Sequence, residues 1–310
     1  MINIVGRRKI YFILSGVLVG AAIIAMLAFG FKEGIDFAGG TLWQFSAGQT
    51  NPAASSLEDT FKNDFKIPDV RVNYDLTNGT FLARLGVVSE PDHQKFLSIL
   101  KSKYPSFTEL SFQSIGPSVG AELRHNAFLA IALVIIGISL YIAFAFRKVS
   151  RPISSWKYGV ITLVTLFHDV VIPAGLFAAM GYFAHIEIDS NFIVALLVVM
   201  GFSVHDTIVV FDRIRENLIL NRGKDDFATT INSSVNQTLA RSVNTSLTLI
   251  LVLIALYFVG PVNLRYFVLT LLVGVTTGIY SSIFIASPAL LVVSGKAARS
   301  LNSNTQKNVA

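Results

Sequence analysis

The sequence predicts a polytopic α-helical membrane protein with six transmembrane helices and one small α+β domain between the first and second spans. Of its 310 residues, 53% are hydrophobic and only 14% are charged, whereas soluble proteins carry about 25% charged residues. Six apolar runs are long enough to cross a hydrocarbon core of about 30 Å. One stretch, residues 32–124, is instead polar and has alternating patterns.

The apolar runs divide the chain into four parts. Residues 1–31 hold a short basic N-terminus and the first span, Ile10–Phe31, which has no small-x-small cleavage site before Lys32 and is expected to be retained. Residues 125–293 hold the other five spans, and residues 294–310 form a polar tail. These five spans are Asn126–Phe146, Tyr158–Phe183, Asn191–Phe211, Leu239–Val259 and Tyr266–Val293. A polar connector with helical character, residues 212–237, joins the fourth span to the fifth.

Residues 32–124 are expected to fold as a separate domain. Helical spacing occurs at Ser55–Phe65 and Pro91–Tyr104, and Asn78-Gly79 is typical of a hairpin turn. Alternation predicts strands at Thr41–Ala47, Val70–Leu76, Thr80–Val88 and Phe107–Ile115. The order β-α-β-β-α-β matches the ferredoxin-like fold. Before it, GIDFAGG (residues 34–40) lacks the spacing of a phosphate-binding loop and predicts a tight exit turn from the first span.

The distribution of Lys and Arg predicts the orientation in the membrane. Basic residues gather in four segments that lie on one side, which must be the cytoplasm because cytoplasmic loops carry the positive excess. They are Arg7, Arg8 and Lys9; Arg147, Lys148, Arg151 and Lys157; Arg213, Arg215, Arg222 and Lys224; and Lys296 and Arg299. Both termini are therefore expected in the cytoplasm, and the α+β domain outside.

The fourth span carries the main candidate for function. Asp206, preceded by His205, lies inside the predicted hydrocarbon region. An aspartate at such a depth costs roughly 2.5–3.5 kcal/mol on insertion scales, and such residues are usually functional. Arg241 enters the fifth span from the same side to a similar depth, so the two side chains can meet if their helices are neighbours. A carboxylate poised between burial and a cationic partner can act as a proton relay; the alternative is a permanent Asp–Arg clasp that fixes helix packing.

His168 and Asp169 in the third span are weaker relay candidates, because a hydrogen-bonded interior histidine is the commoner case. The chain has no cysteine, which excludes disulfides and thiolate metal sites. We find no catalytic arrangement and no metal motif, and predict that the chain is not an enzyme. The basic residues lie beside apolar spans rather than in a patch with aromatic residues, so no nucleic acid is expected as a partner.

Six motifs resemble the SecF family of the Sec protein translocase, within the resistance–nodulation–division (RND) superfamily. They are GIDFAGG (34–40), IGPSVGAEL (115–123), FHDVV (167–171), GFSVHDTIVVFDRIREN (201–217), TLARSVNTSLT (238–248) and GIYSSIFIASPALL (278–291). The resemblance implies an accessory subunit of the bacterial cytoplasmic (inner) membrane that uses the proton-motive force, with the proton as its coupling ion and no other cofactor. It implies SecD as an obligate partner, contact with the SecYEG channel and a translocating preprotein, and YajC as a further candidate partner. The α+β domain is then periplasmic.

The resemblance also assigns proton coupling to Asp206 and Arg241. His205 stands where the family often has Asn, and Ser242 where it often has Thr. Two other functions remain open from the residues. One is half of a proton-coupled small-molecule exporter, for which the outer domain is small. The other is a purely structural scaffold of the translocase.

Overall fold

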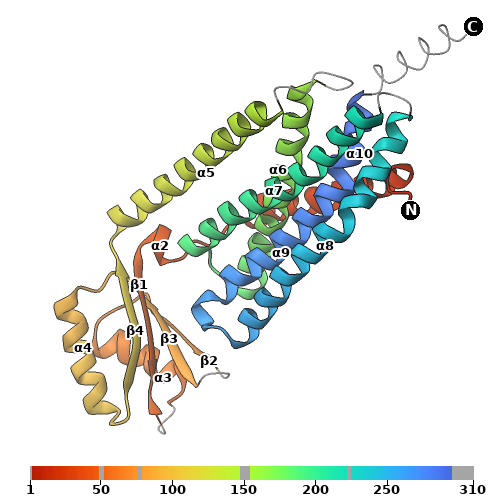
Figure 1. Ribbon diagram of the computed structural model, residues 1–310. Coiled ribbons are helices and arrows are strands. Elements are labelled where there is room, and N and C mark those ends of the chain that lie inside the picture. The colour runs from red at the N-terminus through yellow and green to blue at the C-terminus, as the bar shows by residue number, and fades with distance from the viewer. Residues whose placement is uncertain (1, 49–51, 76–78, 147–153, 222–224, 295–310) are drawn as a thin grey trace, which may run out of the picture. The chain divides into compact units, whose positions relative to one another are not determined.

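The computed structural model describes residues 2–48, 52–75, 79–146, 154–221 and 225–294, and it divides into two compact units (Figure 1). One unit, Met1–Lys32 with Leu129–Ala310, is helical; the other, Glu33–Phe128, is an α+β domain. Six helices are long and apolar enough to cross a membrane, so the predicted fold class is confirmed. Among the predicted features, Asn78 and the basic residues Arg147, Lys148, Arg151, Arg222, Lys224, Lys296 and Arg299 lie outside the described residues.

Each predicted span corresponds to one long helical segment. The first is α1 (Arg8–Phe29), which follows a short 3₁₀ turn, and the sixth is α9 (Arg265–Ser281), which continues through a π-helical turn, η5 (Ser282–Ala286), into α10 (Ser287–Ser294). The other four are α5 (Pro117–Ala145), α6 (Ser155–Ala184), α7 (Ser190–Asn221) and α8 (Phe227–Val259).

Three helix boundaries differ from the predicted ones. Helix α5 begins at Pro117 rather than Asn126, because proline is well suited to the first helical position. Helix α7 continues to Asn221 and α8 begins at Phe227, so most of the predicted connector is helical. Hydropathy marks the end of an apolar run, but it does not mark the end of a helix, because the helical backbone hydrogen bonds of α7 and α8 continue into the polar residues. The result is a polar helical hairpin at the end of the bundle where the N-terminus also lies.

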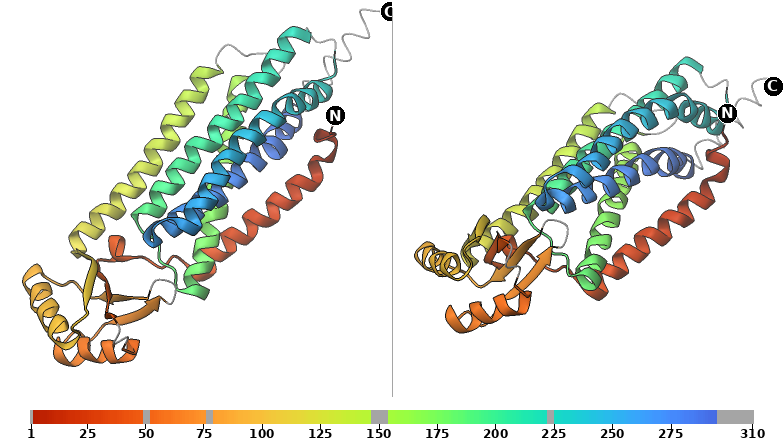
Figure 2. Two further views of the ribbon diagram at one scale, coloured as in Figure 1. Left: turned by 60° about the horizontal axis from the view of Figure 1, so that its bottom comes forward. Right: turned by 90° about the horizontal axis from the view of Figure 1, so that it is seen from below.

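Helix α9 is the central element of the helical unit, because it packs against α6, α7 and α8. Figure 2 shows α7, α8 and α9 running side by side. Two glycines allow close helix contact: a Cβ at Gly274 would collide with Val199 on α7, and one at Gly175 with Ala22 on α1. Small residues at helix crossings are typical of membrane bundles. This close packing brings polar side chains of α6, α7, α8 and α9 into one interior.

The α+β domain has the predicted ferredoxin-like order. Its strands β1 (Gly40–Ser46), β2 (Arg71–Asp75), β3 (Thr80–Leu85) and β4 (Thr108–Ile115) form an antiparallel sheet in the order β2-β3-β1-β4. Its helices are α3 (Ala54–Asp59), which continues as a π-helical turn, and α4 (Glu90–Lys103). Trp43, Phe45 and Phe81 of the central strands are almost fully buried beneath them. The domain therefore has a hydrophobic core of its own.

The two chain connections of this domain touch each other. GIDFAGG folds into a short helix, α2 (Ile35–Ala38), followed by Gly39 with φ +76°. A Cβ at Gly39 would press on the backbone of Ile115, the last residue of β4, and of Pro117, the first residue of α5. The segment is thus the tight turn that the sequence predicts, and it requires glycine for both conformation and space.

Polar contacts reinforce this junction within the domain. The Arg124 guanidinium on α5 pairs with the Glu33 carboxylate and donates to the Phe37 carbonyl oxygen at 3.0 Å. Arg84 on β3 donates to the Glu33 carbonyl oxygen at 3.1 Å. A Cβ at Gly120 would lie 3.0 Å from the Phe37 oxygen. The segment that enters the domain and the helix that leaves it are therefore fastened together.

Candidate functional site

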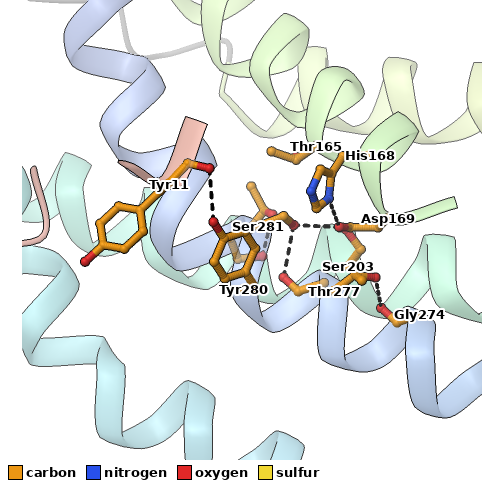
Figure 3. Close-up of polar contacts among 12 residues, drawn as sticks. Tyr11, Thr165, His168, Asp169, Ser203, Gly274, Thr277, Tyr280 and Ser281 are labelled. Carbon is orange, nitrogen blue, oxygen red and sulfur yellow. Dashed lines mark hydrogen bonds and ion pairs between the residues drawn. The ribbon is translucent and has the colours of Figure 1, made fainter. Parts of the chain in front are cut away.

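Asp169 on α6 is a fully enclosed carboxyl group of the bundle, with 0% of its surface exposed. Figure 3 shows three side chains converging on it. Ser203 of α7 and Ser281 of α9 donate to its Oδ2 atom at 2.5 and 2.6 Å. His168 Nδ1 lies 2.8 Å from Oδ1. Three helices are thus joined through one carboxyl group, in an interior where hydrogen bonds are stronger than in water.

Asp206 follows Ser203 on the same helix, α7, and is 5% exposed. Its Oδ2 atom has no hydrogen-bond partner among the described residues. Ser242 of α8 and Ser282 of η5 are neighbours of the carboxyl group, and Asp169 is close enough to interact with it electrostatically. The interior therefore holds two carboxyl groups on adjacent helices: Asp169 with three partners, and Asp206 with one oxygen unpaired.

The hydroxyl groups beside Asp206 depend on the π-helical turn. Thr207 Oγ1 lies 2.8 Å from Ser282 Oγ, and Ser287 Oγ donates to the Ser282 carbonyl oxygen at 3.1 Å. Pro288 has no N–H to donate to the carbonyl four residues earlier, which favours a departure from regular α-helix at this point. The extra residue of a π turn brings both Ser281 and Ser282 to the buried side.

The predicted ion pair between Asp206 and Arg241 is absent from the part of the chain that the structure describes. Helices α7 and α8 are neighbours, as the pairing requires. The Asp206 side chain faces the interior, whereas Arg241 is exposed and Ser242, the next residue of α8, faces inward instead. His205 is likewise exposed, although it remains within electrostatic range of Asp206. The rotation of each helix about its axis decides this, and a single sequence does not specify it.

His168 is buried and hydrogen-bonded through Nδ1, but its Nε2 atom has no partner among the described residues. Its ring lies near that of Tyr280, with centroids 6.2 Å apart. We did not predict Ser203, Thr207, Ser281 or Ser282 as site residues. In the sequence each is only a hydroxyl residue inside an apolar run, and such a hydroxyl group usually donates to a carbonyl oxygen of its own helix. Within the described residues, no cluster of three or more His, Asp or Glu could hold a metal ion.

Comparisons with known proteins agree on one family. Residues 95–296 match the family described as protein export membrane protein SecD/SecF, C-terminal. The protein translocase subunit SecF of Thermobaculum terrenum is 44% identical over 304 residues, covering 95% of this chain and 94% of that protein. The protein translocase subunit SecDF of Thermus thermophilus is 35% identical over 298 residues, covering 94% of this chain and 38% of that protein.

The fold agrees as well. A crystal structure of SecDF, described as a translocon-associated membrane protein from Thermus thermophilus, matches with a TM-score of 0.79 and 34% sequence identity. The match covers 95% of this chain and 38% of that one. This chain therefore spans less than half the length of that structural relative.

Proposed function

We propose that this chain, a member of the SecD/SecF family of protein export membrane proteins with an accessory role in Sec translocation, couples the proton-motive force to protein export. The observation that carries the proposal is Asp206, a nearly buried carboxyl group with one oxygen unpaired, beside a second buried carboxyl group, Asp169. A proton-coupled motor needs such a group, because one proton changes its charge where few other charges compensate.

The exposed face of α7 and α8 supports a second membrane subunit as partner. His205, Arg241 and Asn244 are exposed on apolar helices, and facing lipid they would each be costly. A partner that covers them removes that cost. Single chains named SecDF, of which this chain spans 38%, support SecD as that partner. We further place the complex in the bacterial cytoplasmic membrane, with both termini in the cytoplasm, next to the SecYEG channel, a translocating preprotein and YajC.

The geometry suggests how a proton would change the assembly. When Asp206 is ionised, its negative charge attracts Arg241 across the short distance between neighbouring helices. When it is protonated, that attraction ends, and Arg241 turns back to the outer face, where the structure has it. Because α7 and α8 both pack on α9, a shift between them reaches the rest of the bundle. The relay set proposed is Asp206 and Arg241, with His205 beside them and His168 with Asp169 behind.

Two substitutions test the relay. In Asp206→Asn and, separately, Arg241→Met, we expect the proton gradient to stop stimulating preprotein export, because the first variant lacks the carboxyl group whose charge a proton switches and the second lacks the cation that this charge attracts. The measurement is export into inverted membrane vesicles with and without a proton gradient, at equal amounts of assembled complex. The matched control is Ser139→Ala on α5, which removes a hydroxyl group bonded to its own helix without changing charge.

Wild-type stimulation in both variants would refute proton coupling. Such a result, combined with loss of export when the outer domain is deleted, would favour a structural scaffold instead. Transport of a small molecule by the complex, without preprotein, would favour the alternative function, half of a proton-coupled small-molecule exporter.

A further inference from the structure

Helix α8 carries a regular series of buried hydroxyl groups. Every fourth residue over four turns is serine or threonine, and each of these side chains is less than 9% exposed. We call this series the hydroxyl column: Thr230, Ser234, Thr238, Ser242 and Ser246. At 1.5 Å rise per residue it extends over roughly 24 Å. Because each step of four residues turns by only about 40° around the helix, the column forms a slowly winding polar line along α8.

The two inner members of the column differ from the other hydroxyl groups of the helix. A serine or threonine in a helix commonly donates to its own carbonyl oxygen one turn back. Thr238 does so to Ser234, and so does Thr245, on the outer face, to Arg241. Ser242 and Ser246 are 1% and 0% exposed, yet their Oγ atoms have no partner among the described residues. The Asp206 carboxyl group lies beside the Ser242 hydroxyl group, and both hydroxyl groups retain hydrogen-bonding capacity that ordered water would satisfy.

Asp206 supplies an independent observation at the same place. Its unpaired Oδ2 atom belongs to a different helix, and Ser242 is among the neighbours of its carboxyl group. Buried polar atoms left without partners are costly unless water satisfies them, and a buried water typically forms about three hydrogen bonds. The oxygen atoms of Asp206, Ser242 and Ser246 that lack a partner among the described residues are groups that ordered water would satisfy.

At its other end the column is linked to exposed charges by side-chain hydrogen bonds that begin at Ser234. Asn217 Nδ2 donates to Ser234 Oγ at 2.8 Å and to Gln237 Oε1 at 2.9 Å. Arg213 Nε also donates to Gln237 Oε1, at 2.6 Å. Arg213 pairs in turn with Glu216, which is exposed. A polar path therefore leads from the interior of the bundle to the end where α7 and α8 are joined.

We propose that the hydroxyl column, with ordered water at Ser242 and Ser246, is the route by which a proton leaves Asp206 toward the joined end of α7 and α8. This inference rests on the proposed function, in which Asp206 takes up and releases protons. The proton passes from Asp206 Oδ2 to water, and each water or hydroxyl group accepts one proton as it donates another. The titratable groups that interact electrostatically with Asp206 are Asp169 of α6 and the exposed His205 of its own helix, and Arg213 and Glu216 lie at the exit.

The test measures proton flux in vesicles that contain the full chain with SecD, under an imposed pH gradient and with an enclosed pH-sensitive dye. We expect the double variant Ser242→Ala with Ser246→Ala to lower the flux about 100-fold, the lower range of what a positioned proton donor contributes. Ser242→Gly leaves room for a water molecule in place of the hydroxyl group and should retain more flux than Ser242→Ala. The matched control is Ser139→Ala on α5, where the hydroxyl group is exposed and bonded to its own helix.

The outcomes separate the two proposals. If Asp206→Asn has no flux but the double variant conducts like the wild type, the column is refuted and the proton-coupled function stands. If Asp206→Asn conducts normally, the proposed function itself fails. Equal losses in Ser242→Ala and Ser242→Gly, with less complex recovered, would identify a packing role and overturn the proposed route.

Discussion

At the scale of single residues, the two interior carboxyl groups have opposite surroundings. Asp169 is held by three side-chain partners from its own and two other helices, whereas Asp206 keeps an unpaired oxygen. Asp206 could be found from the sequence because a carboxylate in an apolar run is conspicuous. The donors of Asp169 could not, because Ser203 and Ser281 look like ordinary helical serines until packing brings them together. For the same reason, the inward or outward direction of Arg241 required the structure.

The Asp169 cluster predicts a stability effect. Ser281→Ala removes one of the two hydroxyl donors to Asp169 Oδ2, and the loss of a hydrogen bond to a buried charged or polar group costs about 1–3 kcal/mol. We therefore expect a lower free energy of unfolding, measured as a lower melting temperature of the purified complex in detergent. Thr276→Val is the matched control, because that hydroxyl group is exposed and bonded within α9. Equal melting temperatures for the two variants would contradict the structural importance of this cluster.

At the scale of helices and strands, local patterns predicted most of the architecture. Hydropathy located all six spans, and alternation with an Asn-Gly turn located the ferredoxin-like order, because both depend on neighbouring residues. The start of α5 at Pro117 was not predicted. The predicted helical character of the connector is confirmed, but its two halves continue α7 and α8, since a helix continues wherever its backbone bonds do. The π turn at Ser282–Ala286 was also missed. Its only local sign is Pro288, which is compatible with several kinds of distortion.

The contact between α9 and α7 gives a prediction at this scale. A Cβ at Gly274 would collide with the Val199 side chain, so Gly274→Ala must push the helices apart. Overpacking of this kind costs about 1–3 kcal/mol. Gly137→Ala on α5 is the control: its Cβ would meet nothing within 4 Å, and alanine favours the helix by up to about 1 kcal/mol. Thermal unfolding of both variants should move in opposite directions; a shift of the same sign and size would show that the crossing is not tightly packed.

At the scale of the whole molecule, the chain consists of two units with separate hydrophobic cores. The helical unit is built around small and hydroxyl residues that allow helices to approach, and the α+β unit around aromatic rings. Trp43 alone contacts the rings of five neighbours: Phe45, Phe61, His93, Phe107 and Phe112. This separation could be inferred from composition alone, because residues 32–124 differ in kind from the rest.

The separate aromatic core predicts that residues 33–128 fold without the bundle. The chain has two tryptophans, and only Trp43 lies in this fragment, so its fluorescence reports directly on the core. We expect a cooperative urea transition with an unfolding free energy of about 5–15 kcal/mol. Phe45→Ala should lower that value by about 3–5 kcal/mol, as for other buried aromatic residues. Solvent-exposed emission from Trp43 in the absence of urea would show that the fragment depends on the membrane unit.

The contacts between the segment that enters the α+β domain and the helix that leaves it have a mechanical consequence. Arg124 pairs with the Glu33 carboxylate and donates to the Phe37 carbonyl oxygen, and Arg84 donates to the Glu33 carbonyl oxygen. Tension applied to the sheet is therefore shared by both chain connections. Several polar contacts must break together before the two connections separate. The two connections of this domain therefore cannot be pulled apart without breaking these contacts.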